Sequence, residues 1–91
     1  MANIRSSAKR ARQNGKRRDR NRYYRSTART HIKTARAELD AGDLESAEAS
    51  ILAAIKSLDR AAQKGVIHPN NAARRKSRLV KSLNKAKALA A

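Results

Sequence analysis

Residues 5–22 read RSSAKRARQNGKRRDRNR, and this stretch limits the possible folds because it has no apolar face. Ala8 and Ala11 are its only apolar residues, while nine of its 18 residues are Lys or Arg. A packed helix needs an apolar stripe to bury, so the segment extends beyond the core or is disordered. Repulsion among the cations opposes a helix in water, and we expect the helix to form when phosphates of a bound partner neutralise them.

The rest of the chain can bury only a thin core. It has 14 Ile, Leu and Val residues against 19 Ala, and Tyr23 and Tyr24 are its only aromatic residues. A chain of 91 residues is long enough for one small domain, so we expect a single domain over residues 1–91.

Apolar residues recur every three or four positions in three segments, which predicts helices over approximately residues 5–41, 44–64 and 69–88. No alternating stretch predicts a strand. Because the turns between the helices are short, the expected fold is all-α, an antiparallel three-helix bundle whose long basic first helix extends beyond the core. The expected stripes are Tyr24, Ala28, Ile32, Ala35 and Leu39; Leu44, Ala47, Ile51, Ile55, Leu58 and Ala62; and Leu79, Leu83, Ala86 and Ala90, widened by Val80 and Leu89.

The helix boundaries carry their own signals. Gly42 and Gly65 are typical of the residue that follows a helix, and Asp43 is typical of the cap that begins one. Val66 and Ile67 then supply the apolar contact that accompanies a glycine cap. The third helix begins near Pro69, with His68, Asn70 or Asn71 as alternative caps.

Charge is divided into three blocks. Residues 1–36 carry 13 Lys and Arg against one acid, residues 37–63 carry two bases against six acids, and residues 64–91 carry eight bases and no acid. Two basic blocks around an acidic middle indicate that two segments face one polyanion, while the middle faces water or protein.

Arginine dominates the basic blocks, and its planar guanidinium can donate to two phosphate oxygens at once. We therefore expect residues 1–22 to be a basic RNA-binding extension of the first helix, with charge on all sides. The second block would bind phosphates from the third helix. The expected phosphate ligands are Arg10, Arg12, Lys16, Arg17, Arg18, Arg20, Arg22, Arg25 and Arg29, with Arg74, Arg75, Lys76, Arg78, Lys81, Lys85 and Lys87.

Other side chains give weaker signals. Tyr23 is the better candidate for stacking on a base, because Tyr24 lies four residues before Ala28 and is expected to pack on the bundle. His31 and His68 lack neighbouring ligands, so we expect turn or cap roles and no metal or other cofactor. The acidic residues have no nucleophile or convergent histidine beside them, which predicts a solvated helix face and no enzymatic activity.

Several classes of protein are disfavoured. Without cysteine there is no disulfide framework, and no apolar run approaches the length of a membrane span. Residues 5–22 also lack the large apolar residues of a membrane-binding amphipathic helix. The Arg-rich beginning is similar in composition to a mitochondrial transit peptide, but we expect an intracellular protein that keeps this segment.

Three stretches carry a resemblance to a known family: MANIRSSAKRARQN at the start, RNRYYRSTARTHIK at residues 20–33, and GVIHPNNAARRKSRLVKSLNK at residues 65–85. The chain resembles the S-twenty family of bacterial small-subunit ribosomal proteins over nearly its whole length. The resemblance implies a three-helix bundle that binds 16S ribosomal RNA directly and supports subunit assembly, with few protein contacts, no membrane and no small-molecule substrate. It also implies a cytoplasmic, ribosome-bound location.

The family's basic signature falls on residues already identified and adds two more, Lys9 and Ser77. A histone-like, DNA-compacting protein is the alternative, since it would share the charge and the alanine-rich helices. Competition between folded RNA and duplex DNA separates the two hypotheses.

Overall fold

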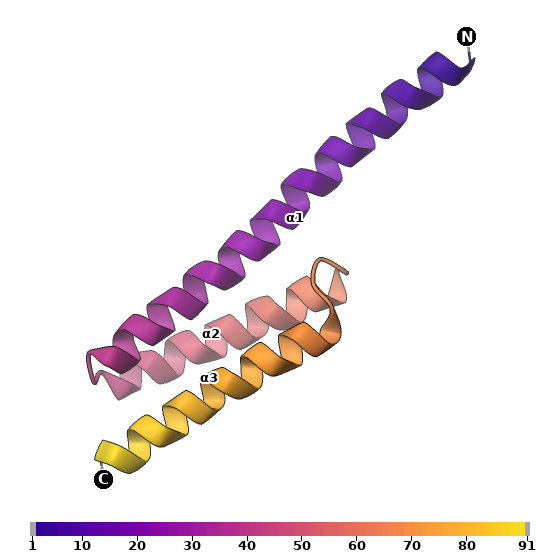
Figure 1. The fold of residues 1–91 in the computed structure, drawn as a ribbon. Helices are drawn as coiled ribbons and strands as arrows, with labels where there is room; N and C mark the ends of the chain where they lie inside the picture. The colour runs from indigo at the N-terminus through magenta and orange to yellow at the C-terminus, as the bar shows by residue number, and fades with distance from the viewer. Residues whose placement is uncertain (1, 91) are drawn as a thin grey trace.

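The computed structural model describes residues 2–90 and contains three helices, α1 (Ala2–Asp40), α2 (Leu44–Gln63) and α3 (Pro69–Ala90). These residues contain no strand. The helices run antiparallel to their neighbours in sequence, and the N-terminal half of α1 projects beyond the other two (Figure 1). The predicted all-α bundle with a long first helix is therefore confirmed.

The helix ends differ slightly from the predicted ones. The first helix begins at Ala2 instead of residue 5, and α3 continues to Ala90 instead of residue 88. Neither end contains a Pro or Gly that would stop a helix, and Ala, Arg and Lys favour one. The first two helices each end one residue earlier than predicted, at Asp40 and Gln63, because the residue before each glycine belongs to the cap.

Both turns use the same C-terminal motif. At the end of α1 the Asp43 amide donates to the Glu38 carbonyl (3.0 Å) and the Gly42 amide donates to the Leu39 carbonyl (3.1 Å). The φ angle of Gly42 is 78°, a conformation that is costly for a residue with a Cβ atom. This is a Schellman motif, and it reverses the chain within a few residues.

The second turn repeats the motif with an apolar contact. Gly65 has a φ angle of 75°, and the Val66 amide donates to the Ala61 carbonyl (2.9 Å). Val66 and Ala61 are both buried, so the turn is anchored in the core. The roles predicted for Gly65 and Val66 are confirmed.

The second and third helices begin with side-chain caps. Asp43 accepts a hydrogen bond from the Ser46 amide (3.3 Å) and is the N-cap of α2, as predicted. Among the three alternatives for α3, the cap is His68, whose Nδ1 accepts from the Asn70 amide (3.1 Å). His31 lies within α1, so the turn or cap role predicted for it is wrong.

The central helix of the bundle is α2. The first and third helices both pack extensively against it and touch each other much less. Alanine occupies many of the buried positions, and its small side chain lets the helix axes approach closely. The buried apolar residues are Ala28, Ala35, Ala47, Ile51, Ala54, Leu58, Ala61, Val66, Ala72, Leu79 and Leu83.

Some expected core residues lie at the edge of the core. Ile55 is only half-buried, and the positions that face inward from the same part of α2 are Ala54 and Leu58. Val80 and Leu89, predicted to widen the stripe of α3, are 39% and 79% exposed. They are exposed because α3 packs on one helix along a narrow strip, so only Ala72, Leu79 and Leu83 are covered.

Replacing Leu58 with Ala should lower the free energy of unfolding by about 2–5 kcal/mol, because it leaves a cavity in the core cluster that the three helices share. Leu58 is fully buried and belongs to the central cluster. Urea unfolding of the RNA-free protein measures the change. Leu52→Ala is the matched control, since Leu52 lies on the same helix and is 57% exposed. Equal losses in the two variants would show that α2 does not bury the Leu58 face.

Candidate nucleic-acid interface

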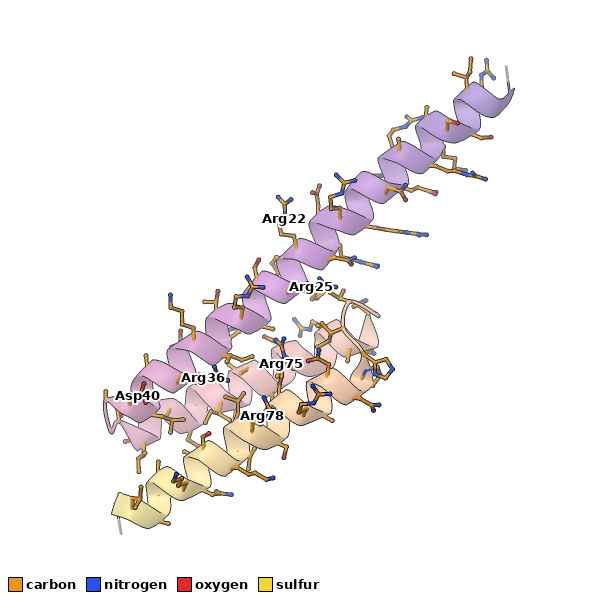
Figure 2. The ribbon with its side chains drawn as sticks, viewed as in Figure 1. Arg22, Arg25, Arg36, Asp40, Arg75 and Arg78 are labelled. Carbon is orange, nitrogen blue, oxygen red and sulfur yellow. The ribbon has the colours of Figure 1, made fainter. Side chains whose placement is uncertain are left out.

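The basic extension, residues 2–22 of α1, is the part of the molecule furthest from the core. All of residues 4–20 except Gly15 are exposed. Because a helix turns by 100° per residue, the cations of this segment point in all directions from the axis (Figure 2). The extension is therefore a convex rod that can meet phosphates on any side.

The basic residues nearer the core line an open groove between α1 and α3, with α2 behind it. Figure 2 shows Arg36, Arg75 and Arg78 over this gap between the two helices. The groove has two hollows, one at the turn between α2 and α3 and the other near the C-terminal ends of α1 and α3.

The hollow at the turn, which we call the end pocket, has a volume of about 310 Å³. Arginines from two helices face it, and the buried apolar residues of the core form its base. None of the residues that line it is acidic. They are Arg25, Ala28, Arg29, Leu58, Ala61, Val66, Ile67, His68, Asn71 and Arg75.

The second hollow, which we call the lower groove, is wider, with a volume of about 640 Å³. Its cations are Arg36 from α1 and Arg78, Lys81 and Lys85 from α3, while Asp40 is its single acid. Arg36 was not among the predicted ligands. It follows Arg29 by seven residues, two helical turns, which places both on one face and could have identified it.

One predicted phosphate ligand also has a structural role. A guanidinium nitrogen of Arg25 (Nη2) donates to the Val66 carbonyl across the bundle (3.1 Å). The bond joins α1 to the turn between α2 and α3, so it fixes where α1 leaves the bundle. Other N–H groups of the guanidinium remain for a ligand.

The cations of α3 are divided between two faces. Lys76 Nζ lies 2.6 Å from Asp59 Oδ1, and Lys87 Nζ lies 3.4 Å from Glu48 Oε2. Both acids belong to α2, and their side chains are still 52% and 53% exposed, in agreement with the solvated helix face predicted for the acidic residues. Lys76 and Lys87 thus face α2, whereas Arg75 and Arg78 line the hollows.

The remaining candidates are exposed outside these hollows. Arg74 and Ser77 are on α3 but line neither hollow. Tyr23 is 62% exposed, and its ring meets the half-buried Tyr24 edge to face, with centroids 5.4 Å apart. The ring of Tyr23 is therefore accessible for the base stacking that the sequence predicts.

Residues 2–90 contain no group of three or more His, Cys, Asp or Glu side chains placed to hold a metal ion. Within the same residues, no helix has the length and apolar character needed to cross a membrane. The surface that the structure does present is dominated by exposed Arg and Lys on two helices. Fold and surface together define a small, basic, all-helical protein of the nucleic-acid-binding class.

Comparison with known proteins narrows this class. Residues 2–84 match the family described as Ribosomal protein S20, and the chain belongs to that family. The small ribosomal subunit protein bS20 of Thermomicrobium roseum is 58% identical over 92% of this chain and 85% of its own length. The proteins of the same name from Mycolicibacterium smegmatis and Pseudomonas aeruginosa (strain LESB58) are 51% and 50% identical. These matches cover 93% and 97% of this chain and 99% and 100% of the relatives.

The matches confirm the family suggested by the three stretches of sequence. They give no support to the histone-like alternative. The individual RNA ligands predicted from the sequence stay predictions.

Replacing Arg25 with Ala should lower the free energy of unfolding by about 1 kcal/mol, because the Val66 carbonyl loses its partner. Urea unfolding without RNA provides the measurement. Arg22→Ala is the control, because Arg22 lies three residues before Arg25 and its side chain is exposed. Its replacement removes the same charge, and its effect should stay within about 0.5 kcal/mol. If both variants unfolded alike, the bond to Val66 would not hold α1 in solution.

Proposed function

We propose that this chain is a structural protein of the small ribosomal subunit that binds 16S ribosomal RNA directly and supports its folding, without catalysis. The observation that carries the proposal is the placement of cations from α1 and α3 along one open groove, continued by the basic extension. Membership of the ribosomal protein S20 family supports it. The protein would then be cytoplasmic and ribosome-bound.

The two parts of this surface suit different features of a folded RNA. The extension is a rod with charge all around, so it can lie between phosphate backbones that would otherwise repel one another. The groove is concave and gathers arginines from two helices on one side. By contacting separate RNA segments, the extension and the groove offset phosphate repulsion and keep the RNA compact.

Replacing Arg17, Arg18, Arg20 and Arg22 with Ala should weaken RNA binding and reduce its dependence on salt. The slope of log K against log salt should fall by about 0.7–0.9 for each phosphate that the variant no longer neutralises. Binding to 16S ribosomal RNA is titrated over a range of salt concentrations. A variant with the same four residues changed to Lys keeps the charge and should keep most of the slope. An unchanged slope in the Ala variant would show that these residues do not bind the RNA backbone.

Selectivity tests the function as a whole. The protein should bind 16S ribosomal RNA at physiological salt in the presence of excess transfer RNA and duplex DNA, because a shaped surface adds to charge. Filter binding or electrophoretic mobility with labelled 16S ribosomal RNA measures this competition. Equal affinity for the three polyanions would favour the histone-like alternative.

Gly15→Ala tests whether the extension folds on RNA. Gly15 lies within α1, and a Cβ atom there meets no heavy atom within 4 Å, so Ala adds helix propensity without a clash. The substitution should stabilise the helix by about 0.5–1 kcal/mol. This should raise the helicity of the free protein in circular dichroism and tighten RNA binding. Gly42→Ala is the control, since its positive φ angle makes Ala unfavourable. Higher helicity without tighter binding would show that folding of the extension is not coupled to RNA binding, and unchanged helicity would show that the extension is already helical in the free protein.

A further inference from the structure

The end pocket differs from the rest of the basic surface because it combines arginines with an apolar base. Ala28, Leu58, Ala61 and Val66 lie beneath the pocket, but they are at most 5% exposed and leave little apolar surface for a ligand. Ile67, from the turn between α2 and α3, is only half-buried and supplies the apolar surface that a ligand can reach. A phosphate alone gains nothing from such a surface, whereas the flat apolar face of a nucleobase does.

The polar groups around the base are donors. Arg29 comes from α1 and Arg75 from α3, so two guanidinium groups face the pocket from opposite walls. Arg25 is held by its bond to the Val66 carbonyl, so less side-chain entropy is lost when it meets a ligand. The ligand is therefore anionic and rich in hydrogen-bond acceptors.

His68 adds a hydrogen-bond donor, and the contact of its other ring nitrogen determines which nitrogen that donor is. Its Nδ1 accepts from the Asn70 amide, so the neutral ring carries its proton on Nε2. Asn71, in the first turn of α3, has a side-chain amide that can both donate and accept hydrogen bonds. Donor and acceptor groups beside an apolar base are the requirements for reading the edge of a nucleobase.

Size excludes a duplex. The volume of about 310 Å³ lies at the lower end of the range for small-molecule sites, roughly 300–1,000 Å³. A base within a double helix is stacked on both faces and cannot enter. Only a nucleotide that has left its stack presents both its base and its phosphate to one small hollow.

We propose that the end pocket binds one unpaired nucleotide of the RNA, with its base over Ile67 and its phosphate between Arg29 and Arg75. This inference rests on the proposed function, because the nucleotide belongs to the RNA that the extension and groove contact. It assigns the pocket a role that charge alone does not give, the recognition of a local RNA shape.

Chemical probing of 16S ribosomal RNA bound to the full chain tests the proposal. Dimethyl sulfate and a carbodiimide report the exposed edges of the four bases, and hydroxyl radicals report the backbone. The wild-type protein should protect one unpaired base. Arg29→Ala with Arg75→Ala should remove that protection and leave the backbone protections of the extension in place.

The matched control is Arg36→Ala with Arg78→Ala, which removes the same charge from the same two helices but from the lower groove. Both double variants should reduce the salt slope by about 0.7–0.9 for each phosphate that is no longer neutralised, and only the first should expose the base. Loss of the base protection in both variants would overturn the proposal, since charge alone would then explain it. Absence of any such protection in the wild type would also overturn it.

A cross-link places the base in the pocket directly. The chain has no cysteine, so Asn71→Cys can carry a single photoreactive group at the pocket and Ser82→Cys a control group in the lower groove. The group at position 71 should react with the protected nucleotide and the group at position 82 should not. Reaction from position 71 with base-paired nucleotides only would overturn the proposal.

Two further results separate this proposal from its alternatives. Adenosine monophosphate added at millimolar concentration before irradiation should not reduce the cross-link from position 71, and its loss while the RNA stayed bound would assign the pocket to free nucleotides instead. If the backbone protections by the extension were missing as well, the proposed function itself would have failed. If they remained and the base protection was absent, only the nucleotide pocket would be wrong.

Discussion

The helices α1 and α3 both pack against α2, and this arrangement determines the rest of the structure. The contact positions of α2 form a narrow face that is rich in alanine. Ala47, Ala54 and Ala61 are fully buried, so the helices can pack closely with few large side chains. Since both outer helices use α2 as their partner, little apolar surface is left to join them to each other. The groove between them stays open to solvent. Polar residues can therefore line it without losing their hydration.

Charge pairing then divides the cations of α3 between α2 and the groove. The acids Asp59 and Glu48 of α2 pair with Lys76 and Lys87 of α3, and this exposed pairing contributes little to stability. Its larger effect is on the electric field. Negative charge is gathered around α2, so the positive potential is concentrated along α1 and the groove.

Sequence patterns were sufficient for the features that depend on neighbouring residues. Gly42, Asp43 and Gly65 fix the two turns through their own backbone and side-chain chemistry, so the element order followed from them. The sequence patterns did not predict which side chains of a helix face a neighbouring helix. Lys76 and Arg75 are adjacent in the sequence, but a rotation of 100° directs one to α2 and the other to the groove. Likewise, the bond between Arg25 and Val66 joins residues 41 positions apart, and no local pattern indicates it.

The continuity of α1 connects the two parts of the interface mechanically. Its 39 residues form one helix about 58 Å long, and only the C-terminal half packs on the bundle. In the proposed function, a rigid connection makes the second RNA contact intramolecular once the first has formed, which raises the effective concentration of the second site. This gain requires that the extension leaves the bundle at a fixed angle, and the bond from Arg25 to Val66 restrains that angle where α1 leaves the core. Gly15, ten residues further out, is the weakest point of the helix, so the outermost turns can adapt to the RNA while the inner ones stay aligned with the groove.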